Sequence, residues 1–138
     1  MIALDTNVIV RLVTADDPGQ TATARAVFEA GDLWICKTVL LETEWVLRYS
    51  YKLSPETIRK AFRSLLGYPQ LQVEDRGAVL RGLHFYEVGL DFADALHLAS
   101  SGEADRFATF DRPFSESARS LEGGPTVVLL GQALPDAP

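Results

Sequence analysis

Short apolar runs alternate with longer amphipathic stretches along most of the chain. Four apolar runs are typical of buried strands, at 1–4, 33–36, 106–109 and 126–130, and a fifth candidate strand covers 71–73. Helical periodicity lies between them, at 6–13, 20–30, 39–51, 56–66, 76–87 and 92–101, with a weaker pattern at 114–120. Strands that alternate with helices predict βαβ units and a parallel sheet, hence an α/β fold.

Capping residues agree with several of these boundaries. Ser54 followed by Pro55 is typical of an N-cap with proline at the first helical position. Thr38 is the N-cap expected for the helix at 39–51, and Gly31 ends the helix at 20–30. In parallel α/β folds ligands bind at the carboxyl ends of the strands. Polar residues directly after a strand are therefore the first candidates for a functional site.

Length and composition indicate an ordinary globular protein. The chain has 138 residues, 47% of them hydrophobic and 23% charged, which fits one domain of roughly 150 residues. We place that domain at 1–133 and expect the Pro-rich tail at 134–138 to be loose. One cysteine, Cys36, allows no intramolecular disulfide and fits a reducing cytoplasm. No signal peptide and no apolar run of ~20 residues occurs, so we expect a cytoplasmic protein without a membrane partner.

The excess of acidic over basic residues disfavours some classes of function. A net charge of −6 argues against a protein that passively coats nucleic acid, because such proteins are normally basic. It does not argue against an enzyme that binds a metal ion, since the ion supplies local positive charge.

Two aspartates lie just past predicted strands. Asp5 comes after the strand at 1–4 and is followed by Thr6 and Asn7, so one carboxylate and two smaller polar groups lie at the carboxyl edge of the sheet. Asp111 repeats this pattern after the strand at 106–109, with the hydroxyl of Thr109 nearby. The structural alternatives are an N-cap for the helix at 6–13 and an Asp-x-Pro turn after Asp111.

Two glutamates lie two positions apart on the helix predicted at 39–51. At about 100° per residue, Glu42 and Glu44 point about 200° apart. Glu44 lies four residues before Arg48, the favourable order for a surface ion pair. Glu42 is expected on the apolar side, near Trp45 and Tyr49, where a carboxylate needs a cation or donors. We therefore predict that Glu42 is the functional acid and Glu44 is solvated.

A further acidic pair opens the helix at 92–101. Asp91 is expected to be the N-cap, and Asp94 lies in the first turn, near the positive end of the helix dipole. Both acids could serve only as caps, but Asp94 shares its helix face with His97, which favours a functional role. His97 itself could act as a general base or a phosphate contact, or simply fill a helix–sheet boundary.

Four acids brought together would repel one another unless a cation binds them, and one or more would take up protons. Oxygen ligands suit magnesium, with manganese as a substitute, rather than zinc. The sequence leaves open whether one metal ion or two would bind.

These segments together resemble the PIN domain, in particular the VapC-type toxins of bacterial toxin-antitoxin pairs. Each motif alone is weak, but four in this order are specific, and the similarity covers almost the whole chain. The matching segments are 4–7 (LDTN), 41–48 (LETEWVLR), 91–96 (DFADAL) and 108–111 (ATFD).

The resemblance implies a three-layer α/β/α fold with a central parallel sheet of four to five strands. It implies a magnesium-dependent endoribonuclease, usually a homodimer, which is inhibited by a cognate antitoxin. It also implies that metal is held by Asp5, Glu42, Asp94 and Asp111. The RNA target is not implied, because related toxins cut different RNAs.

Two further groups of residues are candidates for RNA contacts. Arg11 and Arg112 are expected to contact RNA phosphates in preference to Arg48, which already has Glu44 as a partner. Exposed aromatic residues can stack bases, but Trp45, Tyr49 and Tyr51 at helical spacing are more typical of a core or a dimer interface.

Other function classes fit less well. A phosphoacceptor receiver domain needs an acidic pair after the first strand and a lysine after the last, and a haloacid-dehalogenase-type phosphatase needs Asp-x-Asp, where this chain has Asn7. The remaining alternative is a non-catalytic PIN-like binding module.

Overall fold

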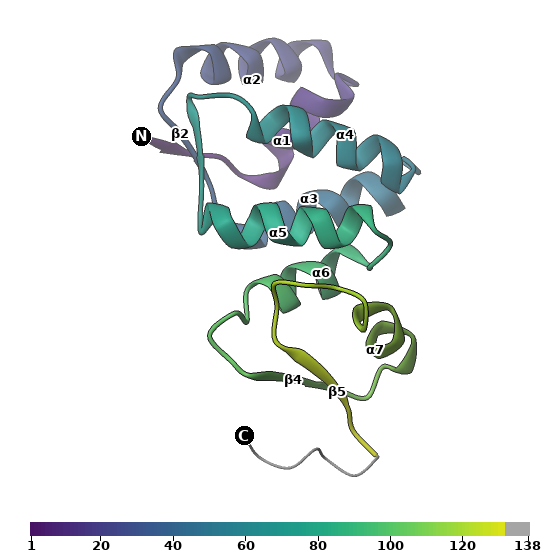
Figure 1. Ribbon diagram of the computed structural model, residues 1–138. Helices are drawn as coiled ribbons and strands as arrows, with labels where there is room; N and C mark the ends of the chain where they lie inside the picture. Colours follow the sequence, from purple (N-terminus) through teal and green to yellow (C-terminus); the bar gives the residue numbers. More distant parts are fainter. Residues whose placement is uncertain (132–138) are drawn as a thin grey trace. The chain divides into compact units, whose positions relative to one another are not determined.

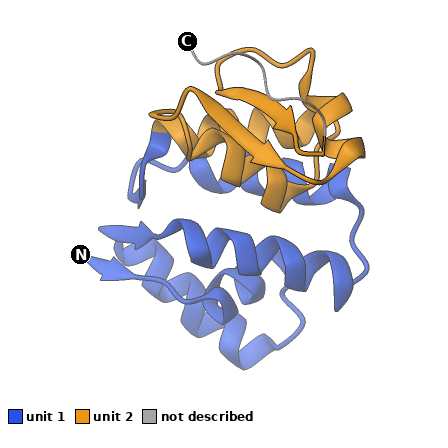
Figure 2. Cartoon of the chain, turned by 90° about the horizontal axis from the view of Figure 1, so that it is seen from below, with its two compact units in different colours: residues 1–76 blue, residues 77–138 orange. Residues whose placement is uncertain are grey.

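The structure, a computed structural model, describes residues 1–131. The tail predicted at 134–138 lies outside the described residues. The chain forms two compact units, one comprising Met1–Arg76 and the other beginning at Gly77 (Figures 1 and 2). The prediction of a single domain over 1–133 stays a prediction.

The first unit contains a parallel three-stranded sheet with the strand order β1-β2-β3. Ile2 pairs with Leu33, and Leu33 pairs with Leu71. Two of its strands lead directly into helices, so α1 and α3 both begin at the carboxyl edge of this sheet (Figure 1). In chain order the elements are β1 (Ile2–Ala3), α1 (Thr6–Thr14), α2 (Pro18–Ala30), β2 (Leu33–Ile35), α3 (Lys37–Tyr49), α4 (Pro55–Leu66) and β3 (Leu71–Val73).

The second unit contains a parallel pair of strands in which Arg106 lies opposite Thr126. The helices α5 and α6 approach closely at Gly82, where a Cβ atom would lie only 3.4 Å from the Cα atom of Leu96. This packing fixes α6, which carries Asp94. In chain order the elements are α5 (Arg76–Glu87), α6 (Phe92–Ala99), β4 (Arg106–Thr109), α7 (Arg112–Ala118) and β5 (Thr126–Leu129).

The strands agree with the sequence pattern in position and direction. All five predicted strands are present, including the candidate at 71–73, and every described pairing is parallel, which confirms the α/β class. The arrangement differs from the prediction in one respect: within residues 1–131 the strands form a sheet of three and a sheet of two, not one central sheet. Alternation of strands and helices predicts parallel strands but not which strands share hydrogen bonds.

Helix boundaries shift by a few residues from the predicted ones. Ser54 caps α4 as predicted, accepting from the Thr57 N–H at 3.2 Å. The helix α3 begins earlier than predicted, because Cys36 and not Thr38 is its N-cap residue. The longest helices, α2 and α3, have 13 residues each, and no helix within residues 1–131 is long and apolar enough to cross a membrane.

A polar network ties the end of α1 to the segments that follow α1 and α3. The Arg11 guanidinium donates to Gln20 Oε1 at 2.7 Å, to Asp16 Oδ1 at 3.0 Å and to the Tyr51 hydroxyl at 3.0 Å. Tyr51 in turn donates to Asp16 Oδ2 at 2.7 Å. These contacts raise the pKa of Arg11, mainly through Tyr51, and lower the pKa of Asp16, mainly through the same hydroxyl.

The variant Tyr51→Phe removes both hydrogen bonds of this hydroxyl and keeps the ring. We expect it to lower the free energy of unfolding by about 1 kcal/mol, because part of the network is solvent-exposed. Urea denaturation measures the change. Ser64→Ala, which removes an exposed hydroxyl on α4, is the control, and a Tyr51→Phe effect no larger than that of the control would show that the network does not stabilise the fold.

Candidate functional site

Asp5 lies at the carboxyl end of β1 and is the N-cap of α1. Its Oδ1 atom accepts from the Thr6 N–H at 2.7 Å, a contact that does not use Oδ2. The Asp5 side chain is exposed, Thr6 is buried with 6% exposure, and Asn7 is exposed. The capping role of Asp5 is therefore real, and it leaves a carboxylate oxygen at the sheet edge for another ligand.

The two glutamates of α3 have the opposite burial from the predicted one. Glu44 is only 1% exposed, whereas Glu42 is exposed. The predicted ion pair between Glu44 and Arg48 forms, but its carboxylate is buried and does not lie on the surface. Glu44 Oε2 lies 2.9 Å from Arg48 Nε, and Glu44 Oε1 accepts from Arg48 Nη2 at 3.1 Å. The prediction that Glu44 is solvated is wrong, as is the prediction that Glu42 points into the apolar side.

The reason lies in which residues of α3 face the core. The buried stripe of the helix is Leu40, Thr43, Glu44 and Leu47, which places Glu44 at its centre. The side near Trp45 and Tyr49 was expected to be the apolar one, but Trp45 is 55% exposed and Tyr49 is 49% exposed. Glu42 remains the better candidate ligand for a different reason: its carboxylate is accessible, whereas Glu44 is held by Arg48.

In the second unit, Asp91 and Asp111 both lie within electrostatic reach of Asp94. Asp91 is the N-cap of α6, as predicted, and accepts from the Ala93 N–H at 3.1 Å. Asp94 lies half-buried in the first turn. Burial raises the pKa of Asp94, the negative charges of Asp91 and Asp111 raise it further, and His97 acts in the opposite direction. The expected repulsion between carboxylates is thus present at Asp94.

Asp111 is held in place by its neighbours on both sides. Its Oδ1 atom accepts from the Phe114 N–H at 3.0 Å, which makes it the N-cap of α7 and starts that helix at Arg112. Its own N–H donates to the Thr109 hydroxyl at 3.0 Å. Thr109, predicted as a supporting residue, thus fixes the backbone that carries Asp111.

Two substitutions at Asp111 can separate its role as a helix cap from the role of its charge. Asp111→Ala removes the cap and is expected to lower the free energy of unfolding by about 1 kcal/mol. Asp111→Asn keeps a good capping side chain and is expected to leave stability within a few tenths of a kcal/mol of wild type, while removing the charge. Thermal denaturation of both variants measures this, and equal destabilisation by the two would contradict the cap.

The two arginines predicted to contact phosphate differ in their surroundings. Arg11 already serves the polar network at the end of α1, and it lines a pocket of about 490 Å³ beside β1 together with Asn7. Arg112 is exposed at the first position of α7. Contacts of either residue with phosphate stay a prediction.

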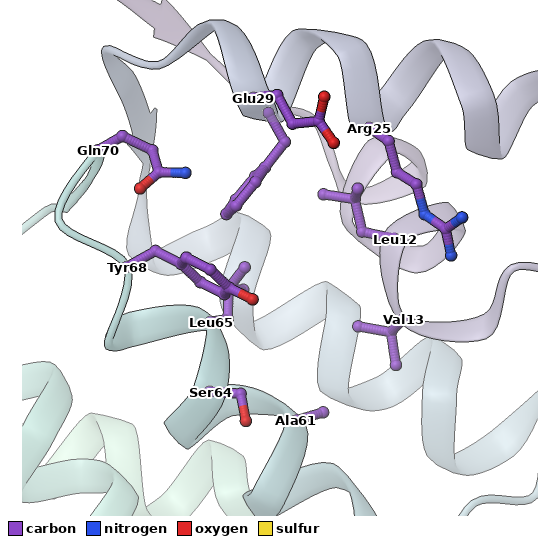
Figure 3. A pocket seen from close by; sticks show the side chains of 10 residues that line it. Leu12, Val13, Arg25, Glu29, Ala61, Ser64, Leu65, Tyr68 and Gln70 are labelled. Carbon is purple, nitrogen blue, oxygen red and sulfur yellow. The ribbon is translucent and has the colours of Figure 1, made fainter.

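Another pocket of the first unit lies away from the predicted site residues. It has a volume of about 450 Å³ and is bordered by α1, α2 and α4 (Figure 3). Tyr68 lies edge-on to Phe28 at its wall, with ring centroids 5.0 Å apart, and Arg25 and Glu29 extend from α2 (Figure 3). None of the four predicted metal ligands lines it.

The sequence reasoning missed one acid at a strand end. Glu74 follows β3 and accepts from the Lys37 N–H at 2.9 Å, so it satisfies the start of α3 where Cys36 provides no side-chain cap. The neighbouring Asp75 binds the Lys37 ammonium at 2.8 Å. The rule that singled out Asp5 and Asp111, an acid directly after a strand, would also have found Glu74.

The predicted ligands therefore divide between the units, with Asp5 and Glu42 on the first and Asp94 and Asp111 on the second. Within residues 1–131 there is no group of three or more His, Cys, Asp or Glu side chains that could hold a metal ion. The donors fit magnesium in kind, because all are carboxylate oxygens. The repulsion at Asp94 also marks a place where a cation would be favoured.

Comparison with known proteins identifies the family of the chain. A search of curated proteins finds no match. The PIN domain family matches residues 2–120, which is most of the chain and includes all four predicted ligands. PIN domains are generally nucleases. The chain belongs to the PIN domain family.

Proposed function

We propose that this protein is a magnesium-dependent endoribonuclease that hydrolyses phosphodiester bonds in RNA. In this proposal Asp5, Glu42, Asp94 and Asp111 hold the metal, and manganese can replace magnesium. The observation that carries it is the half-buried Asp94, whose pKa is raised by burial and by the charges of Asp91 and Asp111, an arrangement that a bound cation would relieve. The accessible carboxylates of Asp5 and Glu42 add support.

The residues of the chain have distinct parts in this proposal. A bound magnesium ion would activate water for attack and neutralise charge at the phosphate. Asp5 and Asp111 each use one carboxylate oxygen as a helix cap, which fixes their orientation before any ligand binds. His97, whose charge acts on Asp94, would contact a phosphate or transfer a proton in this proposal.

The second candidate is a non-catalytic PIN-like binding module. The observation in its favour is that the described residues contain no group of three acids ready to hold a metal. Against it stands the presence of an acid at each of the four motif positions, since a binding module has no need to retain them.

Incubation of purified protein with mixed RNA distinguishes these two functions. The nuclease proposal predicts internal cleavage with magnesium, none with EDTA, and recovery when magnesium or manganese is restored. Asp5→Ala is predicted to be inactive, with the exposed acid variant Glu116→Gln as the charge-matched control. Equal cleavage by wild type and Asp5→Ala would point to a contaminating nuclease and remove the basis of the proposal.

We further propose that the protein acts in the cytoplasm as the toxin of a type II toxin-antitoxin pair, as a homodimer inhibited by a cognate antitoxin. The support is the similarity of the four motif segments to VapC-type toxins. Induced expression in a bacterium is then expected to stop growth, and Asp94→Asn is expected to be harmless. Growth arrest that is not relieved by the product of a small neighbouring gene would favour a stand-alone nuclease.

A further inference from the structure

Two aromatic side chains on α3 are exposed beside each other. Trp45 and Tyr49 are 55% and 49% exposed, although the opposite side of the same helix is fully buried at Leu40 and Leu47. Their ring centroids lie 5.2 Å apart with a 42° angle between the planes. The two rings thus form one continuous aromatic surface, which we call the aromatic pair.

The aromatic pair contacts the ion pair between Arg48 and Glu44 of the same helix. The Arg48 guanidinium carbon lies 4.8 Å from the centroid of the Tyr49 ring. Arg48 is itself fixed by Glu44, with Arg48 Nε 2.9 Å from the Glu44 Oε2 atom and Glu44 only 1% exposed. Tyr49 therefore stacks on an anchored cation, which orders the exposed surface before anything binds to it.

The aromatic pair adjoins a predicted metal ligand. Glu42, Trp45 and Tyr49 are separated by three and four positions on α3, the spacing of neighbours along one helix face. All three side chains are exposed. A chain that stacked on these rings would pass within one helical turn of Glu42.

The size of this surface favours nucleobases over a second protein copy. Two half-exposed aromatic side chains offer about 200 Å² of apolar area, whereas a stable interface buries about 800 Å² on each partner. The positions around them, Glu42 and Ser50, are polar and exposed. A protein with a net charge of −6 gains little from phosphate neutralisation, and stacking provides affinity that does not depend on positive charge.

We propose that Trp45 and Tyr49 stack the bases of single-stranded RNA next to Glu42. The inference rests on the proposed function, since it identifies the form in which the RNA substrate is held. Unpaired bases have free faces for stacking, whereas bases within a duplex do not. The affinity of the protein for RNA should therefore depend on the bases and not on the backbone alone.

Binding measured without cleavage tests this proposal. The probes are a fluorescent single-stranded RNA of about twelve nucleotides and a matched strand that lacks bases, both in EDTA. Trp45→Ala is expected to weaken binding of the RNA by about 5- to 150-fold and to leave binding of the base-free strand unchanged. Trp45→Phe should retain most of the affinity. Val88→Ala, at an apolar side chain with 53% exposure elsewhere, is the control and should bind normally.

Other outcomes would overturn the proposal. Unchanged affinity of Trp45→Ala, equal weakening with both strands, or no binding of RNA by wild type in EDTA would each show that stacking is absent. Light scattering that changed from dimer to monomer on Trp45→Ala would assign the aromatic pair to contact between copies. Cleavage is a separate readout: stacking without magnesium-dependent cleavage would refute the nuclease only, and cleavage with normal binding by Trp45→Ala would refute the stacking only.

Discussion

Replacement of Asp94 by Asn should reduce magnesium-dependent RNA cleavage by about a thousandfold or more. The side chain keeps its size but loses the charge that would bind a divalent ion, and such an ion contributes several kcal/mol to the stabilisation of charge in the transition state. Initial rates of cleavage with fluorescent RNA measure the effect. Activity within about tenfold of wild type would remove Asp94 from the metal site.

The same variant should stabilise the metal-free protein at neutral pH. Burial and neighbouring carboxylates raise the pKa of Asp94 above its ordinary value of 3.8, so the fold favours the protonated form. The protonated Asp94 side chain therefore contributes to the stability of the fold. This contribution is fully present below pH 3.8 and is lost as the pH rises through the pKa of Asp94 in the folded state. Asn cannot ionise and avoids this loss.

Thermal denaturation in EDTA across a range of pH tests whether ionisation of Asp94 destabilises the fold. Asp94→Asn should melt above wild type at pH 7, and the difference should shrink as the pH falls toward 4 or below. Glu116→Gln, which removes an exposed charge on α7, is the control and should show no such pH dependence. A lower melting temperature of Asp94→Asn at pH 7 would contradict unfavourable ionisation at this position.

The two glutamates of α3 should respond to alanine substitution in opposite ways. Glu44→Ala removes a buried acceptor from Arg48 and is expected to lower the free energy of unfolding by about 2 to 3 kcal/mol. This is below the range for a fully buried pair, because the Arg48 side chain is 29% exposed. Glu42→Ala changes an exposed side chain and should leave stability within about 0.5 kcal/mol of wild type.

RNA cleavage should depend on Glu42 more than on Glu44, the reverse of their effects on stability. Glu42→Ala is expected to reduce cleavage by about a hundredfold or more, because it removes a predicted metal ligand. Glu44→Gln keeps an acceptor for Arg48 and should retain most activity at a temperature where it is folded. Urea denaturation and cleavage rates on the same preparations measure both effects. Loss of activity by Glu44→Gln without loss of stability would exchange the roles of the two residues.

Local features of the fold could be predicted well from the sequence. Apolar runs between polar segments located each strand, and short-range capping chemistry identified Ser54 and Asp91 as N-caps. Such signals depend on a few adjacent residues. Pairing of the strands depends on backbone hydrogen bonds between distant segments, and the division into sheets of three and two was therefore outside the reach of the pattern.

In the candidate site, too, features set by adjacent residues could be predicted from the sequence, and features set by tertiary packing could not. The acids after strands were placed correctly because Asp5 and Asp111 each lie two residues past the end of a strand, β1 and β4, and begin the helix that follows. The side of α3 that faces the core was not, because the positions near Trp45 and Tyr49 were expected to form the apolar side, whereas the buried residues centre on Glu44. Glu44 was expected to be solvated, but its ion pair with Arg48 allows the carboxylate to be buried.

Manganese binding to single-site variants tests most directly the claim that the four carboxylates serve one metal centre. Electron paramagnetic resonance of free Mn²⁺ counts the bound ions in wild type, Asp5→Asn and Asp94→Asn, with Glu116→Gln as the control. The account predicts that wild type and Glu116→Gln bind manganese and that either aspartate variant loses this binding, together with cleavage. Wild-type binding retained by both Asp5→Asn and Asp94→Asn would contradict it.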